Sequence, residues 1–369
     1  MIHLDSYRRY FHFPFVFASA LVLATALPFG AAFTPGMVEL RWMIMFLALI
    51  HVPMTFYLLA DPVIRSRLRS RPITLIVVPA LFFPLCILVN AAPFPNGNWA
   101  FVPFMFFLLA WQSWHFGKQN VGVCSFICIA QNRIGGMPPV ERRLLMFGAA
   151  LGVVGSYLIS VTQIDRVPQI DYDFLRSMKG IVWHVGFFGQ IILLGYSIYY
   201  VLRTRITITN SIALLLSVNF FLPLYFQGPD VEQAYSWTSF AHGVQYMVFL
   251  LFHAMNYSGK TSLKLAALKV QVQQFSKVKM TSVFIITSLL MGDIYLFNIV
   301  VPTNYFSGFL AGVSGFSSGN VGSGIALGVL LTHFWIDSFL WRFKGDPAAR
   351  NWMIVRYDFL FDKSNRKSP

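Results

Sequence analysis

Long apolar runs, separated by short polar stretches, constrain the fold of this sequence more than any other feature. A helix needs roughly 20 apolar residues to cross a membrane, and the 369-residue chain contains about ten runs of that kind. Charged residues make up 11% of the chain, whereas soluble domains average about 25%. We therefore predict an all-α integral membrane protein, a polytopic bundle of about ten transmembrane helices.

The predicted spans set the domain organisation, with boundaries defined to about 2–4 residues. They are Phe15–Phe33, Trp42–Leu59, Ile73–Ala92, Trp99–Phe116, Leu144–Val161, Gly180–Leu202, Ile212–Phe226, Trp237–Tyr257, Thr281–Val301 and Gly322–Trp341. They form one transmembrane domain over residues 1–343. A basic cytoplasmic loop at 258–280 and a cytoplasmic tail at 344–369 complete the prediction.

The net charge of +14 is explained by membrane topology. With the N-terminus in the cytoplasm, 24 of the 28 lysine and arginine residues fall on the inner side, as the positive-inside rule predicts. Both termini are then cytoplasmic. The charge therefore predicts no nucleic-acid partner, and the expected partners are membrane lipid, a lipophilic small molecule and further membrane subunits.

The segment Trp111–Asn120, reading WQSWHFGKQN, follows an apolar run and brings His115, Lys118, Gln119 and Asn120 within six residues. Polar groups at membrane depth are costly, and they persist where they pair, line a cavity or hold a metal or substrate. We expect Lys118, Gln119 and Asn120 to orient a polar group of a substrate. For Lys118 alone, a position that reaches the inner interface is an equal alternative.

Histidines recur on the predicted spans of even number. His51, His253 and His333 lie roughly 10–15 Å above the inner edge at 1.5 Å per residue, so they could meet at one level. His115 joins them from below, or stands higher if its helix continues through 121–130. His242 and His184 lie roughly 27–29 Å up, which allows a second, outer pair.

Two spans carry further polar residues beside their histidines. His333 and Asp337 are four residues apart and share a helix face, where the carboxylate can be a metal ligand or orient the imidazole. His242 and His253 are eleven residues apart, about 16 Å along a helix, with Gln245 and Tyr246 between them. The alternative for each histidine is an interhelical hydrogen bond.

Three other features are predicted to be structural. Cys124 and Cys128 share a helix face and, with Cys86, are expected to be buried thiols. Residues 258–279 form either an amphipathic helix on the inner leaflet or a solvated linker. The Gly- and Ser-rich stretch 306–324 suggests a re-entrant or tightly packed segment.

The heptapeptide WHFGKQN at 114–120 resembles a segment of the bacteriorhodopsin-related-protein-like β-carotene dioxygenases. These are helical bacterial membrane proteins thought to hold iron with histidines. The resemblance implies His115 as a ligand, with His51, His242, His253 and His333 as further candidates, and a location in a bacterial inner membrane. Here Gln119 and Asn120 follow the HFG motif, so the expectation is the wider class of membrane metalloenzymes that act on lipophilic substrates.

The sequence thus favours a non-haem iron oxygenase or related oxidoreductase. Its predicted metal site draws on His51, His115, His242, His253, His333 and Asp337, and Lys118, Gln119, Asn120 and Tyr246 are the predicted catalytic residues. Two alternatives stay open. One is a proton- or ion-coupled transporter, and the other is a cofactor-binding subunit of a larger membrane complex, for which haem is a possible cofactor.

Overall fold

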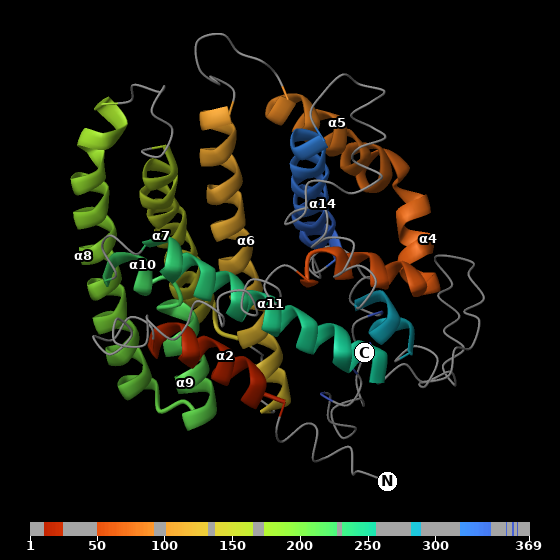
Figure 1. Ribbon diagram of the computed structural model, residues 1–369. Helices are drawn as coiled ribbons and strands as arrows, with labels where there is room; N and C mark the ends of the chain where they lie inside the picture. Colours follow the sequence, from red (N-terminus) through yellow and green to blue (C-terminus); the bar gives the residue numbers. More distant parts are fainter. Residues whose placement is uncertain are drawn as a thin grey trace, which may run out of the picture. The chain divides into compact units, whose positions relative to one another are not determined.

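The computed structural model describes residues 11–24, 50–91, 101–131, 137–164, 173–226, 231–255, 282–288 and 318–340, with positions 352, 356, 357 and 360. Within these residues the chain is entirely helical, without a strand (Figure 1). The fold forms two compact units. Unit 1 comprises residues 1–48, 95–245 and 359–369, and unit 2 comprises residues 49–94 and 246–358. The single domain expected from the sequence stays a prediction.

The described residues of unit 1 form a set of packed helices. They are α2 (Phe13–Ala24), α6 (Phe101–Ala130), α7 (Pro139–Ile164), α8 (Asp173–Thr204), α9 (Ile208–Val218), α10 (Pro223–Phe226) and the first part of α11 (Val231–Met255). α7 packs against α6, α8 and α9. Thr207 caps α9, because its hydroxyl accepts a hydrogen bond from the backbone N–H of Asn210.

The α6–α7 contact is close because Gly117 faces Ala149. A Cβ atom at position 117 would overlap Ala149, so the glycine lets the two backbones approach, as small residues do in membrane helix pairs. Further along α6, the buried thiols of Cys124 and Cys128 face α9, where they contact the carbonyl of Ala213 and the side chain of Asn210. The expectation of buried cysteines on one helix face is confirmed.

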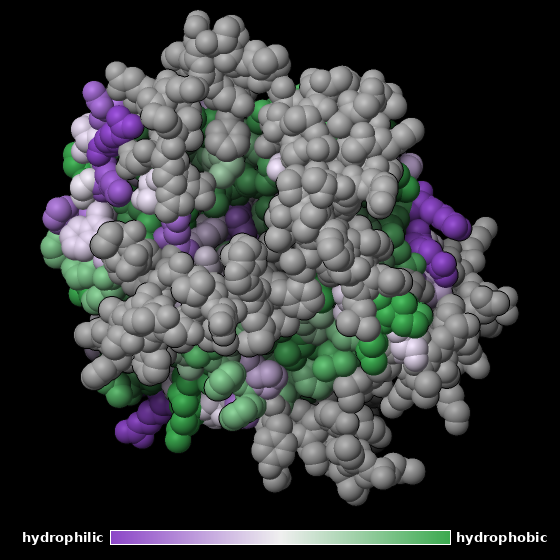
Figure 2. Space-filling model, in the orientation of Figure 1, coloured by the Kyte–Doolittle hydropathy of each residue, from purple (hydrophilic) through white to green (hydrophobic). Residues whose placement is uncertain are grey.

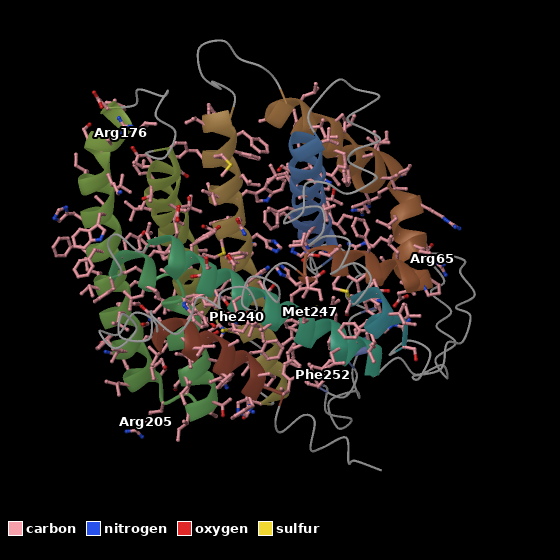
Figure 3. All side chains as sticks on the ribbon, in the orientation of Figure 1. Arg65, Arg176, Arg205, Phe240, Met247 and Phe252 are labelled. Atoms are coloured by element: carbon pink, nitrogen blue, oxygen red, sulfur yellow. The ribbon has the colours of Figure 1, made fainter. Side chains whose placement is uncertain are left out.

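α8 has the surface of a membrane helix. It is 32 residues long, and only 22% of its most apolar window is buried within the protein, so its outer face is apolar and exposed (Figure 2). The labelled side chains of Arg176 and Arg205 lie at its two ends (Figure 3). Arg205 has a positive φ of 48°, the left-handed conformation that commonly ends a helix.

Unit 2 begins with the 3₁₀ helix η2 (Pro53–Ala60), followed by α4 (Pro62–Ser70), the π-helical turn η3 (Ile73–Val77) and α5 (Val78–Ala91). α14 (Ser318–Leu340) packs against α5. At this contact, Cβ atoms at Gly324 and Gly328 would overlap Ile87 and Phe83, so the glycines again set the packing distance.

Proline shapes the start of this unit. Pro79 lacks an N–H group, and the Thr74 carbonyl in the π-helical turn accepts a hydrogen bond of 2.7 Å from Trp335 Nε1 instead. The side chain of Arg67 donates to the carbonyl of Phe339 at 2.9 Å and so binds the last turn of α14.

Among the described residues, three helical segments are long and apolar enough to cross a membrane: Pro139–Thr162, Asp173–Thr204 and Val321–Phe339. The pair Pro62–Ser70 and Ile73–Val89, bent by 108°, makes a fourth if it is one span. The described residues therefore support three or four spans, and the count of ten is not supported.

Several predicted spans differ in detail from the helices observed. α6 continues to Ala130 and does not end at Phe116. The span predicted at 42–59 contains a 3₁₀ helix that begins at Pro53, because proline disfavours an α-helix interior. The span predicted at 212–226 is broken into α9 and α10. Residues 258–279 and most of 306–324 lie outside the described residues.

Candidate metal centre and polar network

The residues predicted to bind a metal fall in both units, and the described part of each unit contains a close histidine pair. Unit 2 holds His51, His253, His333 and Asp337, and unit 1 holds His115 and His242. The two pairs are His51 with His333 and His115 with His242, and each pair could contribute ligands to a metal.

In unit 2, the ring centroids of His51 and His333 are 5.0 Å apart. His51 precedes η2, and His333 lies on α14. His51 is 3% exposed and His333 is fully buried, so water is excluded from both rings. The ring of Tyr246 approaches both, with centroids 5.8 Å from His51 and 5.1 Å from His333. Of the three histidines that the sequence placed at one level, His51 and His333 thus lie close together, and His253 has other partners.

A chain of buried hydrogen bonds connects His333 to Asp337 through Thr55 and Tyr246. The Nδ1 atom of His333 lies 2.6 Å from the hydroxyl of Thr55, and Thr55 lies 2.9 Å from the hydroxyl of Tyr246. Tyr246 in turn donates to Oδ1 of Asp337 at 3.0 Å. The other carboxylate oxygen of Asp337 lies 3.7 Å from His333 Nδ1, so the chain closes into a ring.

The direction of each hydrogen bond in this chain follows from counting protons. An ionised carboxylate only accepts, so the single proton of Tyr246 is donated to Asp337. The proton of Thr55 must then go to the oxygen of Tyr246, and Thr55 accepts from His333 Nδ1–H. With Asp337 ionised, His333 is therefore the Nδ1–H tautomer, and its Nε2 atom carries the lone pair that can bind a metal.

In this geometry Asp337 would support a ligating histidine and would not itself be a direct metal ligand. It lies on the Nδ1 side of His333 and, through Tyr246 and Thr55, holds the imidazole in one tautomer and orientation. Carboxylates commonly support ligating histidines in this way. Of the two roles that the sequence allowed for Asp337, the arrangement favours orientation of the imidazole.

His253 belongs to a separate network in unit 2. Its Nδ1 atom is 3.1 Å from the hydroxyl of Tyr57, and its Nε2 atom is 3.2 Å from Oδ2 of Asp61. Both ring nitrogens are thus engaged in hydrogen bonds, which leaves neither for a metal in this arrangement. We therefore do not retain His253 among the proposed ligands.

Asp61 is the centre of that network. Its Oδ1 atom caps α4 by accepting from the backbone N–H of Val63 at 2.8 Å. Its Oδ2 atom accepts from His253, and also from Trp352 Nε1 and Arg356 Nε, each at 2.9 Å. Burial by itself raises the pKa of Asp61, but the hydrogen bond from His253 and the charge of Arg356 outweigh it and hold that pKa well below its ordinary value.

In unit 1, the rings of His115 and His242 are 4.9 Å apart. His242 is fully buried and stacks on Phe116, with centroids 4.2 Å apart. Gln119 donates to the backbone carbonyl of His242 at 2.9 Å and to the side chain of Gln245 at 3.1 Å. Gln119 therefore ties α6 to α11, which is a positioning role.

The remaining predicted residues of unit 1 have distinct surroundings. Asn120 is 1% exposed, and its side chain has no hydrogen-bond partner within the described residues. Lys118 is exposed on α6. His184 is exposed on α8 and bonds the carbonyl of Gly180 at 2.7 Å, whereas His242 is buried and paired with His115. The outer pair of His184 and His242 is therefore not formed.

Sequence reasoning missed Thr55, Asp61 and Arg356. Threonine is common in apolar helices, so Thr55 carried no signal of its own. Asp61 did carry one, because an acidic residue between an apolar run and Pro62 is a helix N-cap pattern. Its partners, however, lie 192 and 295 positions away, beyond any local pattern.

Comparisons with known proteins add no relative to this description. No family model matches the chain, no curated protein matches it, and no solved structure matches it.

Proposed function

We propose that this chain is a membrane-embedded, metal-dependent oxidoreductase, with an oxygenase acting on a lipophilic substrate as the leading assignment. The observation that carries the proposal is the buried pair of His51 and His333. The hydrogen bonds of Thr55, Tyr246 and Asp337 select one tautomer of His333. Two imidazoles with centroids 5.0 Å apart are close enough to share one ion. The further ligands that such an ion needs stay a sequence-based prediction.

The donor set fits iron. Imidazole nitrogens are ligands that iron accepts, as zinc and copper do, and Asp337 supports one of the two imidazoles through hydrogen bonds. Bound there, iron would supply the redox chemistry with O₂ that the protein side chains lack. The resemblance of residues 114–120 to membrane iron oxygenases supports the same metal.

The side chains of unit 2 perform three tasks in this proposal. Asp337, through Tyr246 and Thr55, keeps His333 oriented with Nε2 unprotonated. The low exposure of His51, Thr55 and His333 keeps water away from reactive species. Tyr246 donates its proton to Asp337 and accepts the proton of Thr55, so a proton can be relayed along the chain.

Elemental analysis of the detergent-purified full-length protein tests the proposal. Near-stoichiometric iron, with no Soret band in the visible spectrum, is the expected result. A Soret band would show that the protein binds haem, and it would favour the alternative of a cofactor-binding subunit. A preparation without metal, made without chelator, would refute the proposal.

The same hydrogen-bond chain also suits the transporter alternative. A buried carboxylate, phenol, hydroxyl and imidazole in series can carry a proton across part of a membrane protein. Proton-coupled flux in liposomes by metal-free protein would support that function.

A further inference from the structure

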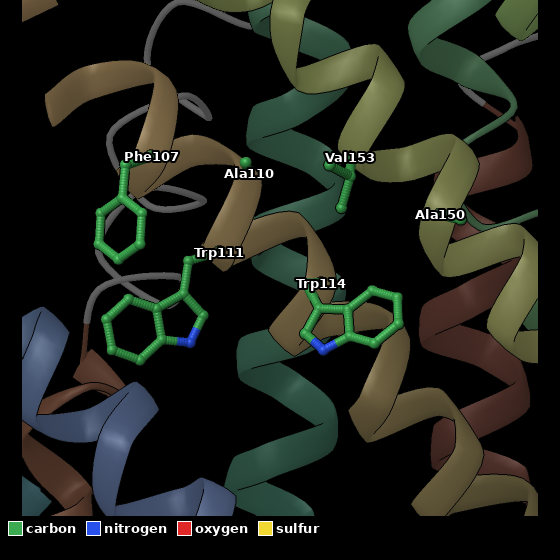
Figure 4. A pocket seen from close by; sticks show the side chains of 6 residues that line it. All are labelled: Phe107, Ala110, Trp111, Trp114, Ala150 and Val153. Carbon is green, nitrogen blue, oxygen red and sulfur yellow. The ribbon is translucent and has the colours of Figure 1, made fainter. Parts of the chain in front are cut away.

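An apolar groove lies between α6 and α7 of unit 1 (Figure 4). It has a volume of about 430 Å³, within the range of about 300–1,000 Å³ that small-molecule sites occupy. Its lining comprises Phe107, Ala110, Trp111, Trp114, Ala150 and Val153. Phe107 is 54% exposed and Trp114 is 38% exposed, so the groove opens to the surface of the protein.

The groove lies against a candidate membrane span. α7 contributes Ala150 and Val153, which fall inside the segment Pro139–Thr162 that is long and apolar enough to cross a membrane. With that segment in a membrane, an apolar groove at this position would face hydrocarbon. An acyl chain is therefore the occupant that its surroundings supply.

One end of the groove is basic. Phe107, Trp111, Trp114 and Lys118 recur at helical spacing along one stripe of α6, and Lys118 is exposed. Gly117 of α6 packs on Ala149 of α7, and the next residue, Lys118, has a side chain long enough to extend its ammonium along the helix toward the membrane interface at the start of α7. The cation thus stands at the end of the apolar stripe.

α7 places a second cation at the same end. Arg143 and Ala150 are seven residues apart and share a face of α7, and both are exposed. Gly117 of α6 packs on Ala149, so Arg143 lies about 9 Å beyond that level toward the start of α7. Within the described part of the chain, Lys118 and Arg143 make no ion pair.

We infer that this groove binds an anionic glycerophospholipid, with one acyl chain between Trp111, Trp114 and Val153 and the phosphate between Lys118 and Arg143. Basic sites between membrane helices recognise anionic headgroups in this manner. Arg143 lies near the start of the candidate span Pro139–Thr162, and the ends of a membrane span lie nearest to the phosphate groups of the bilayer. The site is separate from the proposed metal centre, and its occupation does not require the metal.

Tryptophan quenching by brominated lipids tests this inference on the full-length protein in detergent micelles. Phosphatidylglycerol and phosphatidylcholine with the same brominated acyl chains are compared, because they differ in headgroup charge alone. Nine tryptophans are present, so the double variant Trp111→Phe/Trp114→Phe isolates the groove signal while keeping its lining apolar. We expect stronger quenching by phosphatidylglycerol, and loss of that excess in the double variant.

Charge variants complete the test. Lys118→Met is expected to weaken the preference for phosphatidylglycerol about fivefold, since one basic residue near a membrane surface contributes about that factor, and Lys118→Arg should retain it. Arg203→Met, an exposed residue on α8, removes the same charge and should leave the preference unchanged. Three results would each overturn the inference. They are equal quenching by both lipids, a loss of the preference in Arg203→Met equal to that in Lys118→Met, and quenching by a brominated fatty acid with none by brominated phosphatidylglycerol.

Discussion

The hydroxyl oxygen of Thr55 lies 2.6 Å from Nδ1 of His333, a residue 278 positions later in the chain. With Asp337 ionised, Thr55 gives its own proton to Tyr246 and can only accept from the imidazole. The contact therefore fixes which nitrogen of His333 carries the proton, and it connects the fold of unit 2 to the chemistry proposed for it.

Thr55→Val removes that hydroxyl at nearly constant volume. We expect metal affinity to fall about 10- to 100-fold, as it does when a partner of a ligating histidine is lost, with folding largely retained. Metal retention during titration with a chelator measures the change. Thr238→Val is the matched control, because the hydroxyl of Thr238 is buried but bonds only its own helix at Ala234. Equal metal loss in both variants would contradict the role given to Thr55.

Tyr246→Phe interrupts the same chain at its next link. If Tyr246 and Thr55 act on His333 in series, the double variant with Thr55→Val should bind metal about as weakly as either single variant, because the second change removes a link already broken. A double-mutant cycle on metal affinity measures this coupling. Additive losses would show that the two hydroxyls act independently.

Asp61→Asn removes the charge that Arg356 and His253 surround. Breaking a buried ion pair typically costs about 3–5 kcal/mol, because the remaining charge is left uncompensated. We expect a large drop in the thermal midpoint of the detergent-solubilised protein. Asp173→Asn, which affects an exposed pair with Arg176, should change it little. A midpoint for Asp61→Asn that matches wild type would show that the network does not stabilise unit 2.

The same carboxylate predicts a pH dependence. The pKa of Asp61 is lowered in the folded protein, so its contribution to stability is present above the unfolded pKa of about 3.9 and is lost as the pH falls through the folded value. Thermal midpoints measured downward from pH 5 should therefore fall less steeply in Asp61→Asn than in wild type. Parallel curves would contradict this assignment.

Gly117→Ala tests the close contact of α6 and α7. The added methyl group would overlap Ala149, so we expect destabilisation in spite of the better helix propensity of alanine, which favours it by about 1 kcal/mol. Gly122→Ala on the same helix meets open space and should be neutral or stabilising. Similar thermal midpoints for the two variants would argue against the packing described.

The local features of this fold were predictable from the sequence, and the long-range ones were not. The apolar runs identified α7, α8 and α14 because burial and membrane insertion act on about 20 successive residues. Pro53 could have predicted the change of helix type at the start of η2. The apolar residues around it favoured a continuous span instead. Helix periodicity and depth placed His51, His253 and His333 at one level, and the structure brings His51 and His333 together.

Thr55 was missed, and the connection of Tyr246 and Asp337 to His333 was not predicted, for a physical reason. Thr55, Tyr246 and Asp337 are joined by hydrogen bonds between segments distant in sequence, and the selection of one imidazole tautomer depends on their order in space. His253 illustrates the converse. Its depth matched that of His51, yet its two nitrogens are engaged by Tyr57 and Asp61.

The metal content of His51→Ala and His333→Ala, beside His184→Ala, tests the central claim most directly. All three variants remove one imidazole, but His184 is exposed on α8 and apart from both histidine pairs. Plasma mass spectrometry of detergent-purified protein should find near-stoichiometric iron in wild type and in His184→Ala, and iron lost from the other two. Iron retained at full stoichiometry in folded His51→Ala and His333→Ala would contradict a metal centre built on this pair.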